Sequence, residues 1–243
     1  MAVTNSTDPK FNPRLVLKRM IPVVILGWIV LIALALAGDL KAVSAYLSKF
    51  NWTFFPIALG FTLFNYSLRF FKWHFYTFQI GAIGLSWQQS LRLFVAGFPL
   101  AFTPGKVGEA LKAVWLKRAA GVPTARGVAV IVAERISDGL AVLALSVLGI
   151  VANPQYWPAF LIILLVLLGL VLVSQIRPLA LALLDLGSRM PLIKKFIPAL
   201  REFYEGSYSL FKPGTTLLAV GLGTVSWLGE GIGFYLILVG LGI

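Results

Sequence analysis

The stretch GVAVIVAERISDGLAVLALSVLGIVA, residues 127–152, is long and apolar enough to cross a membrane, yet it carries three charged residues in its first half. A spanning helix needs about 17 to 25 residues, most of them apolar. An ionisable side chain in the hydrocarbon costs about 2.5 to 3.5 kcal/mol on insertion scales, so such residues are usually functional. Glu134, Arg135 and Asp138 are therefore the first candidates for a functional site.

The composition is that of a membrane protein. Hydrophobic residues make up 59% of the 243 residues, charged residues 12%, and the mean hydropathy is +0.90, whereas soluble domains are about 45 to 50% apolar and 25% charged. We expect an all-α fold, a polytopic membrane helix bundle. The basic residues behind the net charge of +12 lie between the apolar runs. This placement indicates a role in membrane orientation and in contact with anionic lipids, not in nucleic-acid binding. With no cysteine and a single histidine, His74, we expect neither a metal site nor a cofactor.

The apolar runs predict a cytoplasmic arm, residues 1–20, and one membrane domain, residues 21–243. The expected spans are residues 21–38, 52–68, 127–152, 158–174 and 215–243. The first is longer than the core of a signal peptide, which favours a retained helix over a cleaved leader. Arg69 and Lys72 follow the second span within RFFKWHFYTF. Aromatic and basic residues gather at the headgroup level, so we expect the helix to end there, with His74 as a structural interfacial residue.

Residues 93–116 are apolar but interrupted by Pro99 and Pro104. Neither residues 93–105 nor residues 107–116 can cross a core of about 30 Å, so we expect a re-entrant hairpin of two broken helices. Irregular backbone survives at membrane depth only inside protein or beside a wet cavity. A helix that begins near Glu109 would point free N–H groups at that interior and suit an anion; alternatively, Glu109 caps the helix and the string is structural.

Residues 175–214 form the longest polar segment, with six basic and three acidic residues and apolar residues at helical spacing. We expect interfacial helices on an anionic leaflet. Most basic residues between the apolar runs fall on one side of the expected topology, and the other side has only Lys41 and Lys49. The positive-inside rule then places the amino terminus and the hairpin entrance in the cytoplasm.

On a helix, Glu134, Arg135 and Asp138 lie at about 0°, 100° and 40°, so they share one face. Their formal charge of about −1 at neutral pH could be complemented by Lys106 or Lys112 of the hairpin. The face either handles a charged headgroup or forms a buried salt bridge that holds helices in register. Both interpretations stay open, and they are compatible.

Two strings resemble the signature segments of a known family. TPGKVGEALKAVWL (residues 103–116) and VAERISDGLAVL (residues 132–143) are similar to segments of the flippase-like membrane family that includes the transmembrane domain of lysylphosphatidylglycerol synthase. The matching positions are Pro104, Gly105, Gly108, Glu109, Glu134, Arg135 and Asp138. The resemblance implies an inner-membrane protein that moves lipids, or lipid-linked intermediates, between leaflets.

The sequence departs from that family in two respects. Family members continue into a second Pro-Gly-Gly-x-Gly segment with an acidic residue, whereas this sequence stops at Ile243, and Glu230 within LGEGIG does not match that motif. We therefore expect either a shortened member of the family or a fragment. The resemblance does not extend to the soluble lysyl-transferring domain of the synthase, so aminoacyl transfer is not implied.

Three functions are compatible with these features. The favoured one is binding and movement of an anionic phospholipid or a polyprenyl-phosphate lipid between leaflets. The expected lipid-binding residues are Pro104, Gly105, Lys106, Gly108, Glu109, Lys112, Glu134, Arg135 and Asp138. The second is an intramembrane enzyme with Glu134 and Asp138 as acid and base; without a positioned nucleophile or a metal-ligand cluster, we expect no catalytic residue. The third is a non-catalytic membrane partner of a lipid-modifying or glycosyl-transferring enzyme.

Overall fold

The computed structural model describes Ile25, Ile29, Ile32, Ala33 and residues 40–98 and 109–243. These residues form helices and connecting turns, with no strand among them, which confirms the all-α fold. The arm at residues 1–20 and nearly all of the first expected span, residues 21–38, lie outside the described residues. So does the hairpin tip, with Pro104, Gly105, Lys106 and Gly108.

Four stretches within the described residues are long and apolar enough to cross a membrane. They are α3 (Phe54–Gln79), α6 (Thr124–Ala152), the short η3 (Pro154–Tyr156) continued by α7 (Trp157–Gln175), and α11 (Pro213–Leu241). Each has 22 to 29 residues, which at 1.5 Å per residue gives about 33 to 44 Å and exceeds a hydrocarbon core of about 30 Å. The protein is therefore an integral membrane protein with a bundle of spanning helices.

Helix α3 continues beyond the expected end of the second span. The aromatic and basic run after Leu68 predicted a helix end at the headgroup level, but the helix continues to Gln79. That prediction is wrong because several of the rings pack inward: Trp73 is fully buried, and Phe70 packs edge-to-face against Trp87 with ring centroids 4.7 Å apart. Lys72, placed by the sequence at the surface, is buried inside the bundle.

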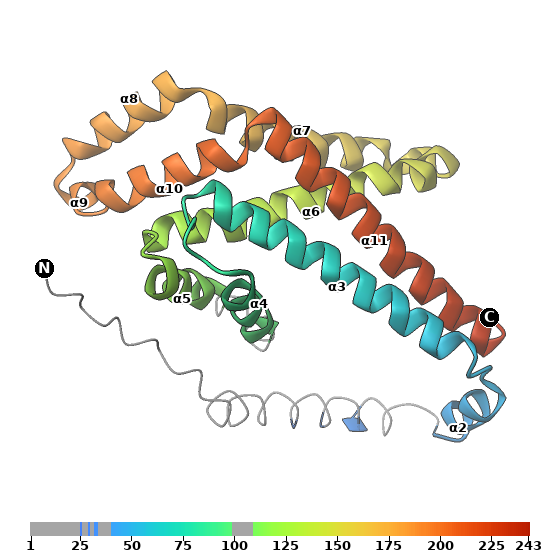
Figure 1. The fold of residues 1–243 in the computed structure, drawn as a ribbon. Coiled ribbons are helices and arrows are strands. Elements are labelled where there is room, and N and C mark those ends of the chain that lie inside the picture. Colours follow the sequence, from blue (N-terminus) through green and yellow to red (C-terminus); the bar gives the residue numbers. More distant parts are fainter. Residues whose placement is uncertain (1–24, 26–28, 30–31, 34–39, 99–108) are drawn as a thin grey trace, which may run out of the picture.

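The spanning helices bring the candidate residues together. Helices α3 and α11 lie side by side, and α6 packs against α11 and α3 (Figure 1). Helix α5 (Ala110–Ala120) packs closely on the start of α6, because Gly127 has no side chain there. A Cβ atom at Gly127 would lie 2.8 Å from the Cα atom of Ala113. The α5–α6 contact therefore depends on a small residue at this position.

Two short helices, α4 (Trp87–Ala96) and α5, flank the tip of the expected hairpin and contact each other. Of the expected first arm, residues 93–105, only residues 93–98 are described, and α5 covers most of the expected second arm, residues 107–116. With 10 and 11 residues the two helices reach about 15 to 17 Å, so neither crosses the bilayer. Helix α4 begins with a capping box, in which the Gln89 N–H donates to Ser86 Oγ and the Ser86 N–H donates to the Gln89 side chain. Re-entry from the cytoplasmic side stays a prediction.

Residues 175–214 contain α8 (Arg177–Ser188), α9 (Pro191–Lys194) and α10 (Ile197–Leu210). Helix α10 lies along α6 and buries Tyr204, Ser207 and Leu210, and α8 contacts α10. Helix α2 (Leu40–Lys49) leads into α3 at the far end of the bundle, where it contacts α11. The polar segment is thus helical and amphipathic, and its position on an anionic leaflet stays a prediction.

Candidate functional site

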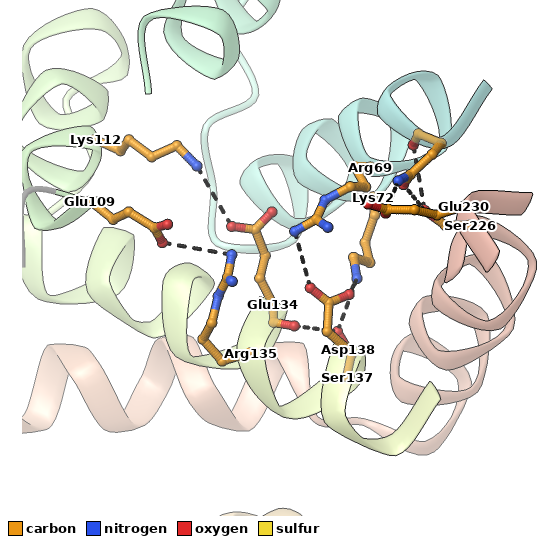
Figure 2. Close-up of polar contacts among 11 residues, drawn as sticks. Arg69, Lys72, Glu109, Lys112, Glu134, Arg135, Ser137, Asp138, Ser226 and Glu230 are labelled. Atoms are coloured by element: carbon orange, nitrogen blue, oxygen red, sulfur yellow. Dashed lines mark hydrogen bonds and ion pairs between the residues drawn. The ribbon is translucent and has the colours of Figure 1, made fainter. Parts of the chain in front are cut away.

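A row of charged side chains links α5, α6 and α3 inside the bundle (Figure 2). We call it the charged cluster; its members are Arg69, Lys72, Glu109, Lys112, Glu134, Arg135 and Asp138. Four basic and three acidic side chains give it a formal charge of +1. Ionisable groups at membrane depth normally pair with one another. One positive charge in this cluster has no carboxylate of its own.

The centre of the cluster is Asp138, whose carboxylate holds two cations from α3. The Lys72 ammonium donates to Asp138 Oδ1 and, at 3.3 Å, to the Ser137 hydroxyl. Arg69 Nη2 donates to the other carboxylate oxygen, Oδ2, at 3.3 Å. Side-chain exposure is 2% for Lys72 and 10% for Asp138, so their pair is nearly closed off from the surroundings.

Arg69 is the more accessible of the two cations. Its side chain is 23% exposed, and its guanidinium lies over the ring of Trp227 in α11, 5.7 Å from the centroid. A guanidinium has about five N–H donors, and among the described residues only the bond to Asp138 uses one. Arg69 thus retains donors for an additional acceptor.

The second ion pair connects α5 to α6. Lys112 Nζ lies 3.8 Å from Glu134 Oε2, too far for a hydrogen bond, and 4.5 Å from the centroid of the Trp73 ring. The ring face stabilises the buried ammonium. Gly97 leaves room for this side chain, because a Cβ atom there would overlap Lys112 Cε and lie 2.9 Å from Cδ. Lys112 thus complements Glu134, as the charge of the helix face suggested.

The third ion pair joins Arg135 to Glu109 at the start of α5, with Nη2 3.6 Å from Oε2. Glu109 makes no capping hydrogen bond at that terminus, and its carboxylate faces Arg135 instead. The Arg135 side chain is 40% exposed, whereas that of Glu109 is 8% exposed. The partner of Arg135 is thus on the neighbouring helix, not Glu134 or Asp138 on its own.

The structure brings together five of the residues chosen from the sequence: Glu109, Lys112, Glu134, Arg135 and Asp138. The four chosen residues of the hairpin tip, Pro104, Gly105, Lys106 and Gly108, lie outside the described residues. Their part in lipid binding stays a prediction.

Sequence reasoning missed the contribution of α3. Arg69 and Lys72 were assigned to the headgroup level, and Asn65 was not singled out. These positions follow the i, i+4, i+7 spacing of one helix face, which was the available signal. Asn65 extends the polar row to α11: its amide donates to Glu230, and the Ser226 hydroxyl donates to its carbonyl oxygen.

Comparison with known proteins gives one match. The model of the family described as "Lysylphosphatidylglycerol synthase TM region" matches residues 19–243, nearly the whole chain. No curated protein and no solved structure matches the chain. The family match agrees with the resemblance of the two sequence strings, which contribute Glu109, Lys112, Glu134, Arg135 and Asp138 to the cluster.

Proposed function

Because the chain belongs to the family of the lysylphosphatidylglycerol synthase TM region, we propose that it binds the anionic headgroup of a lipid at the charged cluster and moves the lipid between leaflets. The family relates the protein to lipids and to the membrane. The cluster supports an anionic headgroup, either of a phospholipid or of a polyprenyl phosphate. The membrane is the plasma (inner) membrane, with the amino terminus in the cytoplasm.

The observation that carries this proposal is the sharing of one carboxylate, Asp138, by two cations. A phosphate can replace the carboxylate on Arg69, and the planar guanidinium can bind two phosphate oxygens at once. Asp138 then pairs with Lys72 alone. Every cation of the cluster has an anion in that state, so the buried charges balance when the headgroup is bound.

Arg69 is the contact for the headgroup because the side chains of Lys72 and Lys112 are only 2% and 8% exposed. Arg135 is the second accessible cation, with 40% of its side chain exposed. Polar partners inside the bundle lower the cost of taking a charged headgroup through hydrocarbon. The acyl chains stay in the lipid while the headgroup follows the cluster.

The hairpin tip completes the proposed site. Lys106, Pro104, Gly105 and Gly108 lie outside the described residues, and the proposal assigns them to lipid binding, with Lys106 as a further cation. The first N–H groups of α5, which begins at Ala110, are available to an anion. Residues 93–116 enter and leave the membrane on the cytoplasmic side. The headgroup therefore enters from that leaflet.

A vesicle assay with purified protein tests the proposal. Wild-type protein should move fluorescently tagged phosphatidylglycerol faster than tagged phosphatidylcholine. Arg69→Gln should slow movement of the anionic lipid by about tenfold to a hundredfold, since a hydrogen bond to a charged group contributes about 1.5 to 3 kcal/mol. Arg177→Gln is the matched control, because Arg177 pairs with Glu205 at 3.1 Å outside the cluster.

Two results would overturn the proposal. One is wild-type protein that moves the anionic lipid no faster than empty vesicles do, which would leave the role of a non-catalytic partner of a lipid-modifying or glycosyl-transferring enzyme. The other is an Arg69→Gln protein that moves the anionic lipid as fast as the wild-type protein does. Mass spectrometry of lipids that co-purify with the protein separates the two sources of the headgroup, phospholipid and polyprenyl phosphate.

A further inference from the structure

An apolar groove runs between α6 and α10, outside the charged cluster. It consists of two hollows that share Phe203. The first, of about 400 Å³, is lined by Ala125 and Val128 of α6 and by Phe196 and Ala199 near the start of α10. The second, of about 290 Å³, is lined by Val132 and Ile136 of α6, with α7 and α8 on its other side. The two hollows thus follow one another along the same pair of helices.

The groove has the length and surface of a site for a hydrocarbon chain. The α6 positions 125, 128, 132 and 136 lie on one helix face and extend over about 16 Å. The hydroxyl oxygens of Tyr204 and Ser207, beside the second hollow, are buried without a hydrogen-bond partner among the described residues. The surface that the groove presents is therefore almost entirely carbon.

Both hollows are open on one side, and they meet at Phe203. A single extended hydrocarbon chain is narrower than a helix of about 10 Å and suits such a narrow apolar surface along α6.

The first hollow lies beside cations that have no acidic partner. Arg189, Lys194 and Lys195 are exposed, and none of them pairs with a carboxylate of the described residues. Lys194 and Lys195 stand between two lining residues of this hollow, Ile193 and Phe196, and Lys195 Nζ lies 4.9 Å from the centroid of the Phe196 ring. Arg177 and Arg201 of the same polar segment, in contrast, are paired with Glu205 and Asp185.

We propose that the groove holds one acyl chain of an anionic phospholipid, whose phosphate lies against Lys194 and Lys195. The apolar surface of the groove packs against the acyl chain, and the lysines beside the first hollow balance the charge of the phosphate. A neutral phospholipid would fill the groove but would leave the ammonium groups without an anion. This site is separate from the charged cluster, so the inference does not rest on transport.

Tryptophan quenching tests the site. Phe203→Trp places an indole between the two hollows. The wild-type protein has seven Trp, so its fluorescence is subtracted to leave the signal of the introduced indole. In vesicles of neutral lipid, a small equal fraction of phosphatidylglycerol or phosphatidylcholine with brominated acyl chains is added. We expect the brominated phosphatidylglycerol to quench the introduced indole more strongly, because it occupies the groove preferentially.

Charge variants test the headgroup contact. Lys194→Gln with Lys195→Gln, in the Phe203→Trp background, should lower the preference for the anionic lipid by about fivefold per lysine. The matched control is Lys49→Gln with Lys212→Gln, which removes the same charge from two exposed lysines elsewhere. The control should keep most of the preference.

Each contrary result overturns the inference. Absence of quenching by either lipid means that the groove is closed to lipid, and equal quenching by both means that it does not select an anionic headgroup. An equal loss of preference in the control means that only the overall charge matters. Fluorescence of the introduced indole that changes with protein concentration in lipid-free detergent would assign the groove to a second copy of the chain.

Discussion

Replacing Asp138 by Leu should destabilise the protein, and adding Lys72→Met to that variant should restore part of the loss. Asp138 is the carboxylate for both Lys72 and Arg69. Asp138→Leu removes it and leaves the Lys72 ammonium, with 2% side-chain exposure, without an anion. The second substitution removes that ammonium and fills its place with an apolar side chain of similar length.

The magnitudes follow from burial. Breaking a buried ion pair by removing one partner costs about 3 to 5 kcal/mol, whereas replacing both partners by apolar residues is often neutral. Full recovery is not expected, because Arg69 also loses its carboxylate. Its side chain is 23% exposed and keeps its contact with the Trp227 ring, so we expect the double variant to recover about 2 kcal/mol of the free energy of unfolding.

Thermal unfolding in detergent, followed by intrinsic fluorescence, measures these differences. For a chain of this size, each kcal/mol of stability corresponds to about 2 to 4 °C in Tm. Asp138→Leu should therefore lower Tm by about 6 to 20 °C. Asp185→Leu serves as the control, since Asp185 is 71% exposed in its pair with Arg201 and exposed pairs contribute little. A double variant no more stable than Asp138→Leu would show that the carboxylate does not compensate Lys72, and the charge balance argued for the cluster would be wrong.

Three further outcomes are expected. Gly127→Ala should destabilise the protein by about 1 to 3 kcal/mol, since its Cβ atom would meet backbone 2.8 Å away; Gly149→Ala, with open space around it, should not destabilise it, and equal unfolding temperatures would contradict this packing. Cysteines at Gln88 and Lys117, both exposed, should label from the cytoplasmic side; labelling from opposite sides would refute the re-entrant hairpin. Arg135→Leu should slow movement of anionic lipid with a smaller loss of stability than Asp138→Leu, because it leaves one group, Glu109, without its partner, whereas Asp138 is the partner of two cations; unchanged movement would remove Arg135 from the site.

The membrane fold could be predicted from the sequence because apolar length is a local property. Helices α6, α7 and α11 begin and end within a few residues of the expected spans at residues 127–152, 158–174 and 215–243. Helix α3 is the exception, since aromatic rings are found both at a membrane interface and in a protein core. Only the position of α4 and its Trp87, against which Phe70 packs, distinguishes these environments.

The residues of the charged cluster could be predicted from the sequence more readily than their pairing. Charges inside an apolar run are visible without a structure, which is why Glu134 and Asp138 were found. The cation that neutralises Asp138 lies 66 residues away in sequence, and nothing local connects the two. The hairpin lysines were the nearest candidates, and Lys112 does pair with Glu134, but at 3.8 Å its ammonium makes no hydrogen bond to that carboxylate.

Charge balance, applied to the whole membrane domain, would have identified Lys72. A carboxylate at membrane depth normally pairs with a cation there, and the long helix alone has one cation, Arg135, for two acids, Glu134 and Asp138. A second cation at membrane depth is expected where a helix continues past the end of an apolar run. Arg69 and Lys72 follow residues 52–68 directly, with no Gly or Pro before Gly81 to end the helix. Their spacing from Asn65 puts all three on one face of a continuous helix. Within the charged cluster the basic side chains outnumber the carboxylates by one. The neighbouring carboxylate, Glu230, accepts a hydrogen bond from the Asn65 amide and pairs with no cation of the cluster. That surplus is the physical reason to expect an anionic ligand at Arg69.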